Sequence, residues 1–128
     1  MLSGTAPAYS AGLECEENSS FAFKDEIECT HGNPEGWKVW VERTSMQAGE
    51  GTFCFENETG HSAFRVHVIV NFMDYFGKFL DRVEKKKSPV HNEQRIKLKG
   101  AIPPKTDKFT CEVYWKEKDV ISVEDERD

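Results

Sequence analysis

A repeating alternation of apolar and other side chains over residues 63–70 constrains the fold of this chain more than any other feature. In this segment every second residue is a large apolar one: Phe64, Val66, Val68 and Val70. Successive side chains of an extended chain point to opposite faces of a sheet, so the pattern predicts a β-strand with one apolar face and one mixed face. A half-buried antiparallel sheet is built from such strands.

The same period of two recurs on both sides of this strand, in segments separated by clusters of Gly, Asn and Pro. Further strands are expected at residues 20–29, 37–42, 52–56, 95–99 and 109–115. Because these strands follow one another and do not alternate with helices, a parallel sheet of strand–helix–strand units is not expected. The sequence therefore predicts a mainly β fold, an antiparallel β-sandwich of about six or seven strands.

One segment has a different period. After residue 71 the apolar residues recur at steps of three and four, which would place them along one face of a helix. They are Phe72, Tyr75, Phe76, Phe79, Leu80 and Val83. Asn71 is a suitable N-cap and the lysines at 85–87 suit the negative end of the helix dipole, although Gly77 would cost about 1 kcal/mol relative to Ala. We predict one amphipathic helix over about residues 72–86, packed on the sheet.

The length and charge of the chain limit its organisation and its partners. With 128 residues the chain fits one domain: we expect a flexible tail over residues 1–14, a single β-sandwich domain over 15–116 and a charged C-terminal tail over 117–128. A net charge of −6 argues against a nucleic-acid partner, because binding to phosphates requires an excess of Lys and Arg. No apolar run approaches the roughly 20 residues that span a bilayer, so no transmembrane segment is predicted. The first residues also lack the basic and apolar regions of an intact signal peptide.

The cysteines and two sequons bear on the cellular compartment. Four cysteines are candidates for disulfide bonds: Cys15, Cys29, Cys54 and Cys111. None is in C-x-x-C spacing, which weighs against a zinc ribbon or a thioredoxin-like motif, and the three possible pairings stay open. Asn18 and Asn57 begin N-x-S/T sequons and are candidates for glycosylation. Together these features predict a protein of the secretory pathway or the extracellular space; the alternative is a cytoplasmic protein with four free thiols.

No complete catalytic or metal-binding motif is present in the sequence. Cys29 and His31 have ligand-like spacing, but a zinc site needs four converging ligands. A Cys54, His67 and Asp74 set has the composition of a nucleophilic triad. However, no family signature surrounds Cys54, and its place between two Phe residues favours a structural role. We therefore expect no cofactor and no metal, and an enzyme is the less favoured interpretation.

The tryptophans are the candidates for binding. Trp37 and Trp40 fall on opposite faces of the strand expected at 37–42, so one is expected in the core and the other half exposed. An exposed Trp can stack on a sugar ring or anchor a protein partner; the alternative is a Trp covered by the helix or a loop. The lysines at 85–87 could contact an anionic surface, although a solvated helix end is the simpler interpretation.

One stretch carries a resemblance to a known family. Residues 51–58, GTFCFENE, followed by RVHV at 65–68, resemble the last hairpin of the GOLD domain of secretory cargo-receptor proteins, a match over about residues 49–70. The resemblance implies a β-sandwich in the secretory pathway, and it implies that Cys54 pairs with Cys29 or Cys15. In the cargo receptors a coiled coil and a membrane anchor follow this hairpin, whereas here a helix and two strands are expected, and Cys111 has no counterpart.

These observations predict a non-catalytic, extracytoplasmic recognition domain with a protein or glycan partner. The GOLD-like version of this function would be secretory cargo or protein–protein recognition. Three alternatives stay open: a secreted effector or toxin-like factor that acts on a host protein or membrane, a small Cys/His enzyme, and a lipid carrier whose helix covers a cavity between the sheets. The oligomeric state is not predicted.

Overall fold

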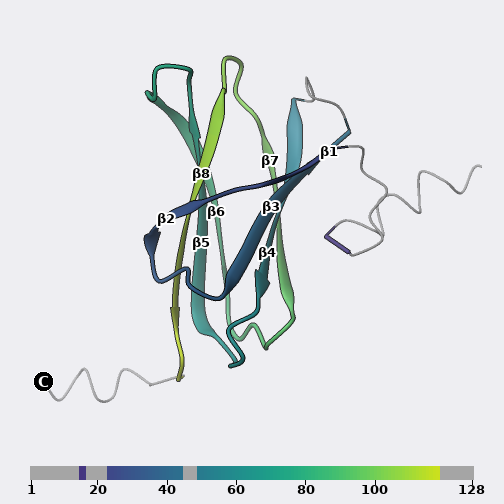
Figure 1. Cartoon of the computed structure of the whole chain (residues 1–128), viewed down its shortest axis with the longest axis vertical. Helices are drawn as coiled ribbons and strands as arrows, with labels where there is room; N and C mark the ends of the chain where they lie inside the picture. The colour runs from purple at the N-terminus through teal and green to yellow at the C-terminus, as the bar shows by residue number, and fades with distance from the viewer. Residues whose placement is uncertain (1–14, 17–22, 45–48, 119–128) are drawn as a thin grey trace, which may run out of the picture.

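The computed structural model describes residues 15–16, 23–44 and 49–118, which form two β-sheets packed face to face (Figure 1). The strands are β1 (Phe23–Glu26), β2 (Cys29–Gly32), β3 (Trp37–Arg43), β4 (Glu50–Asn57), β5 (Phe64–Met73), β6 (Phe79–Lys87), β7 (Arg95–Ala101) and β8 (Lys108–Lys116). The predicted mainly β, sandwich-like architecture is confirmed. The tail expected at residues 1–14 lies outside the described residues.

Each sheet has four strands. The first has the order β1-β3-β4-β7 with all neighbours antiparallel, and the second has the order β2-β8-β5-β6, in which only β2 and β8 run parallel. The chain passes from the first sheet to the second between β1 and β2, at Ile27 and Glu28. Through this crossing, residues 23–32 contribute one edge strand to each of the two sheets.

The core lies between the inner faces of the two sheets. Inward residues alternate along each strand, as the period of two requires: Val39 and Val41 on β3 and Phe53 and Phe55 on β4 are buried. Three phenylalanine rings from both layers meet edge to face at centroid distances of 5.5 to 5.7 Å: Phe53, Phe72 and Phe109. Such ring pairs stabilise a core beyond the area that they bury.

The amphipathic helix predicted over residues 72–86 is wrong, because this segment is the β5–β6 hairpin. Strand β5 continues through Met73, a short turn follows, and β6 begins at Phe79. Gly77 in the turn has a φ of +84°, a left-handed value that glycine adopts easily and that an α-helix does not contain. Asn71, the expected N-cap, lies within β5, where its side-chain amide donates to Glu112 Oε2 at 2.9 Å.

The apolar residues are spaced as in a helix only because those of β5, of the turn and of β6 follow one another in the sequence. On β6, Val83 lies opposite Val70 of β5 and packs against the core. A Cβ on Gly100 of β7 would lie only 2.9 Å from Val83 Cγ1, so Val83 rests directly on the β7 backbone where the two sheets approach each other. Tyr75 and Phe76, by contrast, belong to the turn and are highly exposed.

No helix capable of crossing a membrane occurs in the part of the chain that the structure describes.

Candidate functional site

Two disulfides join all four candidate cysteines. Cys29–Cys111 connects the neighbouring strands β2 and β8, and Cys15–Cys54 fastens the segment at residues 15–16 to β4. The pairing of Cys54 with Cys15 is one of the two that the GOLD resemblance implies. Because disulfides persist in oxidising compartments and are rare in the cytosol, the two bonds indicate a secretory or extracellular environment.

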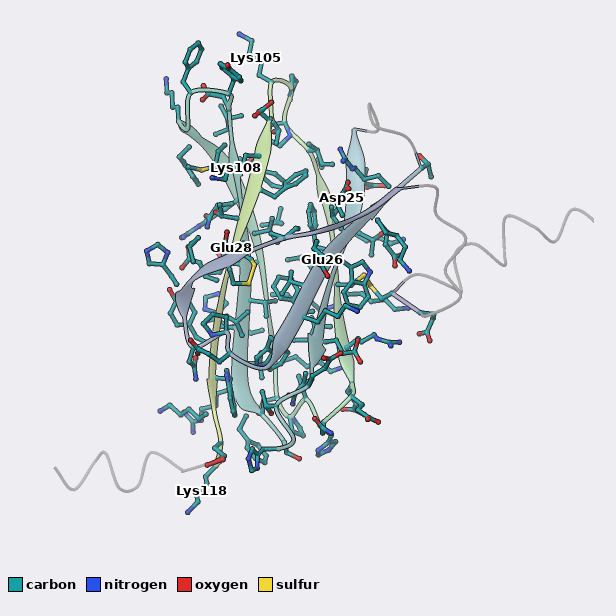
Figure 2. The ribbon with its side chains drawn as sticks, viewed as in Figure 1. Asp25, Glu26, Glu28, Lys105, Lys108 and Lys118 are labelled. Atoms are coloured by element: carbon teal, nitrogen blue, oxygen red, sulfur yellow. A yellow bond between two sulfur atoms is a disulfide. The ribbon has the colours of Figure 1, made fainter. Side chains whose placement is uncertain are left out.

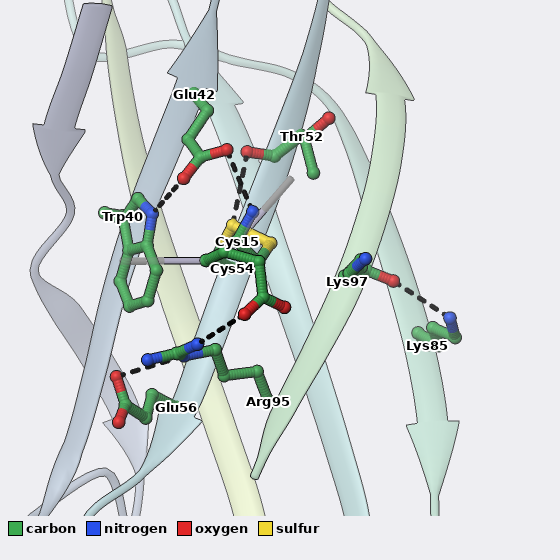
Figure 3. Close-up of a disulfide and its surroundings, with 10 residues drawn as sticks. Cys15, Trp40, Glu42, Thr52, Cys54, Glu56, Lys85, Arg95 and Lys97 are labelled. Carbon is green, nitrogen blue, oxygen red and sulfur yellow. Dashed lines mark hydrogen bonds and ion pairs between the residues drawn. A yellow bond between two sulfur atoms is a disulfide. The ribbon is translucent and has the colours of Figure 1, made fainter. Parts of the chain in front are cut away.

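Trp40 lies on the outer face of the first sheet, yet it is only 8% exposed (Figure 3). The Cys15–Cys54 disulfide packs beside it, and its indole Nε1 donates to Glu42 Oε2 at 2.8 Å. The other carboxylate oxygen of Glu42 accepts the backbone N–H of Cys15 at 3.0 Å. These hydrogen bonds satisfy the buried indole N–H of Trp40 and the buried carboxylate of Glu42. They also hold Cys15 against the outer face of the sheet.

A charged hollow of about 360 Å³ opens beside Trp40. It is lined by three cationic side chains (Lys24, Lys38 and Arg95) and four glutamates. Arg95 forms ion pairs with Glu16 at 3.5 Å and Glu56 at 3.4 Å, and the charged groups of Lys38 and Arg95 lie 5.8 and 6.0 Å from the Trp40 ring centre. The charges of the hollow therefore compensate one another, and cations already occupy the approach to the ring.

Trp37 lies on the opposite face of β3, as predicted, and is partly buried against the main core. Its ring lies 6.4 Å from that of Trp115, whose Nε1 donates to the backbone oxygen of Asn33 at 2.7 Å. Both candidate tryptophans thus have structural roles: Trp37 packs against the core and Trp40 packs against the Cys15–Cys54 disulfide. The expected half-exposed Trp anchor is not Trp40.

The most exposed aromatic residues of the described chain lie instead at the turn of the β5–β6 hairpin. Tyr75 is 78% exposed, Phe76 is 88% exposed, and their rings meet edge to face at 5.3 Å. Phe79, at the start of β6, is 52% exposed. We refer to Tyr75 and Phe76 as the aromatic tip. Sequence reasoning missed this site, although Asp74 and Gly77 on either side of the two aromatics are a turn signal.

Hydrogen bonds within the turn hold the aromatic tip in place. The Asp74 carboxylate oxygen Oδ1 accepts the backbone N–H groups of Phe76 and Lys78, each at 2.8 Å. The Asp74 N–H donates to the carbonyl of Lys78, and the Gly77 N–H donates to that of Asp74, both at 2.9 Å. These four hydrogen bonds fix the backbone of the turn, and the two rings point outwards from it.

The β7–β8 turn lies beside the aromatic tip at the same end of the sandwich (Figure 1). The Asp107 N–H donates to the Met73 carbonyl at 2.8 Å, and Lys108 pairs with Met73 in the sheet. Lys105 and Lys108 are exposed at this end (Figure 2), as is Lys78 in the tip turn itself. Exposed lysines and the exposed Asp107 therefore lie in and next to the two turns at this end of the sandwich.

The outer face of the second sheet carries a polar network. His67 Nε2 lies 2.6 Å from Glu84 Oε1, and this hydrogen bond lowers the pKa of Glu84. Glu112 accepts hydrogen bonds from the Tyr114 hydroxyl at 2.6 Å and the Asn71 amide at 2.9 Å, which together hold the pKa of Glu112 below its usual value of 4.5. The same bond to Glu112 raises the pKa of Tyr114.

The structure does not assemble the Cys54, His67 and Asp74 set. Cys54 is in a disulfide on the first sheet, His67 is bonded to Glu84 on the second, and Asp74 holds the hairpin turn. A disulfide sulfur provides no thiolate for attack or for metal ligation. The same reason removes the buried cluster of Cys15, Glu42 and Cys54 as a metal site, and Cys29, the partner considered for His31, is also in a disulfide.

Asn57 has a structural role in the fold. It is fully buried, and its amide nitrogen donates to the carbonyls of His61 at 2.8 Å and Val90 at 2.9 Å. Its oxygen accepts the N–H and the hydroxyl of Thr59, the third residue of the sequon. Since a glycan would have to occupy this same nitrogen, attachment at Asn57 is incompatible with the folded structure. The other sequon, at Asn18, lies outside the described residues.

Comparison of the chain with models of known protein families, with curated proteins and with solved structures finds no match. What the protein binds must therefore be inferred from its own residues.

Proposed function

We propose that this protein is a non-catalytic, extracytoplasmic recognition domain that binds a protein partner through the aromatic tip. The observation that carries the proposal is the exposure of Tyr75 and Phe76, at 78% and 88%, on a turn whose backbone is held by hydrogen bonds to Asp74. The two disulfides support the extracytoplasmic location. The likeness to GOLD domains stays a prediction and adds protein recognition in the secretory pathway as the setting.

The energetics favour a binding role for these side chains. Burial of an aromatic side chain that is exposed in the free protein contributes about 1.5–3 kcal/mol. Tyr and Trp dominate the hot spots of protein interfaces because they bring a large, rigid surface at low entropic cost. The Asp74 turn fixes the backbone beneath both rings, so less entropy is lost when the tip is ordered in a complex.

The surroundings of the tip favour a protein over a glycan. A sugar is held by a ring face together with polar groups that bond its hydroxyls, but the Asp74 carboxylate and several backbone groups of the turn are already used within the turn. The exposed charged residues of the two turns are Lys78, Lys105 and Asp107, and Lys108 follows at the start of β8, so positive charge prevails there. This combination fits an apolar pocket with an acidic rim on the partner protein.

The test compares the wild-type domain with the double variant Tyr75→Ser/Phe76→Ser. Saturable binding of the labelled domain would be measured on the cell surface and on the secreted proteins of the organism that makes it. We expect the double variant to bind at least tenfold more weakly. The control, Tyr75→Phe/Phe76→Tyr, keeps two aromatic rings at the tip and should bind within a few-fold of the wild type.

Two results would overturn this function. One is equal binding by the wild type and the double Ser variant, or no saturable binding by either. The other is sedimentation equilibrium that gives a dimer for the wild type and a monomer for the double variant, because the tip would then join two copies of the chain.

A further inference from the structure

Strand β6 has an open backbone edge. It lies at the end of the second sheet, where β5 is its hydrogen-bonded neighbour among the described strands. Its residues are exposed apart from Leu80 and Val83, which are partly buried. An edge strand presents backbone N–H and C=O groups with which another strand can pair. We refer to residues 81–87 as the β6 edge.

The hydrogen bonds of β5 show which backbone groups of β6 point to this open side. The carbonyl of Met73 accepts the Asp107 N–H, so Met73 is bonded toward β8. The direction of bonding alternates along a strand, so Val70 is bonded toward β6, where its partner in the register is Val83. The residues on either side of Val83 therefore direct their backbone groups away from β5.

The backbone of Arg82 agrees with this direction. Its N–H donates to the Asp81 side-chain oxygen Oδ1 at 2.7 Å. A side chain of the same strand thus occupies the position that the carbonyl of a further paired strand would take. Glu84, two residues on and also exposed, presents its backbone N–H and carbonyl on the same side.

The edge of the first sheet beside β6 is covered differently. The ammonium group of Lys85 reaches across and donates to the backbone carbonyl of Lys97 on β7 at 2.9 Å (Figure 3). A lysine has three such donors, so this ammonium can bond a second acceptor as well. Lys85 therefore covers part of the β7 backbone and leaves the backbone of the β6 edge open.

The charges of the β6 edge are complementary to those of a second copy of the same strand. Val83 is the one uncharged residue of the segment 81–87, DRVEKKK. In an antiparallel pair centred on Val83, Arg82 of each copy lies opposite Glu84 of the other. In the same pair, Asp81 of each copy lies opposite Lys85 of the other. Opposite charges directly across two strands stabilise their pairing, whereas like charges destabilise it.

Other registers lack this complementarity. Residues that face each other across antiparallel strands share one bonding direction, so two identical strands pair about a residue and not between two residues. Any centre within the β6 edge other than Val83 places a charged residue opposite its own copy. With Glu84 at the centre, for example, Glu84 faces Glu84 and Arg82 faces Lys86. The order of charges therefore selects a single register.

We infer that this protein forms a symmetric homodimer in which the β6 edges of two copies pair in antiparallel orientation about Val83. The second sheets of the two copies then form one continuous sheet. The Arg82 N–H bonds to the Glu84 carbonyl of the second copy, which releases the Asp81 carboxylate to pair with Lys85 of that copy. This inference goes beyond the proposed function and does not rest on it, because the aromatic tip lies outside residues 81–87.

The rival explanation is that the charged residues keep this edge unpaired. Lysines on edge strands hinder association between sheets, and the β6 edge ends in three lysines. In the register about Val83, however, Lys86 faces Leu80. Lys87 faces Phe79, so neither of these lysines meets a like charge. The rival explanation predicts a monomer at every protein concentration.

The experiment measures sedimentation equilibrium of the wild type and of charge-reversed variants from about 1 μM to about 1 mM. Arg82→Glu places two glutamates opposite each other at both symmetric positions, and Glu84→Arg places two arginines there. We expect each variant alone to dimerise at least tenfold more weakly than the wild type. An equal mixture of the two variants restores opposite charges at both positions and should form a heterodimer within a few-fold of the wild-type affinity.

Two controls separate the register from general effects. Lys105→Glu makes the same change in net charge as Arg82→Glu but lies in the β7–β8 turn, and it should dimerise like the wild type. Tyr75→Ser/Phe76→Ser alters the aromatic tip and should also dimerise like the wild type. Loss of partner binding by this tip variant with an intact dimer would then leave both proposals standing.

Each other outcome overturns the inference. A wild type that stays monomeric over the whole range would leave edge protection as the role of the charges. An equal loss for Lys105→Glu and Arg82→Glu would mean that only net charge matters. Failure of the mixed variants to associate would exclude the register about Val83, and a monomeric Tyr75→Ser/Phe76→Ser would place the dimer contact at the tip. A dimer that behaves as expected, together with no saturable binding to a partner, would overturn the proposed function alone.

Discussion

Two aromatic regions of this protein differ in how the fold treats them: Trp40 is covered, whereas the aromatic tip is exposed. Trp40 lies on an outer sheet face and is 8% exposed, because the Cys15–Cys54 disulfide packs against it there. Tyr75 and Phe76 lie on a turn that nothing in the described residues covers, and they are 78% and 88% exposed.

The difference shows that what covers an aromatic side chain, more than its residue type, separates structural aromatics from those available for binding. The indole N–H of Trp40 is part of a buried network with Glu42. At the tip, the Asp74 turn satisfies the polar backbone, and the rings of Tyr75 and Phe76 take no part in it. We therefore expect mutations in the first region to affect stability and those in the second to affect binding.

The largest contrast should come from Trp40→Ala and Phe76→Ala. Removal of the covered indole leaves a cavity and deprives the buried Glu42 carboxylate of a donor, so we expect a loss of about 3–5 kcal/mol of unfolding free energy. Phe76→Ala should stay within about 0.5 kcal/mol of the wild type. Urea unfolding measures both free energies. Similar losses of unfolding free energy for the two variants would contradict the contrast between the two regions.

The next effect concerns what covers Trp40. Cys15→Ala/Cys54→Ala should cost about 2–4 kcal/mol, because it opens a cross-link with a sequence separation of 39 residues. It should also expose Trp40 and shift its fluorescence to longer wavelength. As a control, Cys29→Ala/Cys111→Ala should destabilise the protein at least as much, without this local exposure of Trp40. An unchanged emission spectrum in the first variant would show that the disulfide does not keep Trp40 covered.

A smaller effect should follow from loosening the tip itself. Asp74→Ala removes the acceptor for two backbone N–H groups, and we expect a loss of about 1 kcal/mol and several-fold weaker partner binding as the rings lose their fixed position. Asp74→Asn keeps an acceptor oxygen and should approach the wild type. Full binding by Asp74→Ala would mean that the ordered turn contributes nothing to recognition.

The smallest expected effect is a pH dependence on the outer face of the second sheet. Because hydrogen bonds from Tyr114 and Asn71 lower the pKa of Glu112, the ionised carboxylate stabilises the folded state above its usual pKa of 4.5, and this contribution is lost as the pH falls through the lowered value. Tyr114→Phe removes the larger cause, so the stability of this variant should fall less steeply as the pH is lowered through and below 4.5. Parallel pH profiles of the two proteins would contradict this.

Much of the fold was predictable from the sequence because single strands are specified locally. The strands predicted at 37–42, 52–56, 95–99 and 109–115 all lie within strands of the structure. The strand predicted at 63–70 lies within β5 except for its first residue, but β5 continues to Met73. The period of two in their apolar residues is a local signal, present in the sequence of each strand by itself. The parallel pairing of β2 with β8 has no such local signal, because it depends on where the chain crosses between the two sheets.

The candidate site was predicted poorly for a related reason. The burial of Trp40 depends on Cys15, which is distant in the sequence. The alternation within residues 37–42 contains no information about that contact. The apolar steps of three and four near residue 75 are equally compatible with a helix face and with a hairpin. The choice between them is made by the Asp74 and Gly77 turn together with the pairing of β6 along β5.

The central claim, that the aromatic tip and not the Trp40 region contacts the partner, is tested most directly by site-specific photocrosslinking. A benzoylphenylalanine in place of Phe76 and, in a second protein, in place of the exposed Glu58 beside the Trp40 hollow would be irradiated in contact with cells and secreted proteins of the source organism. We predict one dominant adduct from position 76, blocked by excess wild type but not by Tyr75→Ser/Phe76→Ser, and none from position 58. An adduct from position 58 alone would contradict the account and place recognition at the hollow beside Trp40.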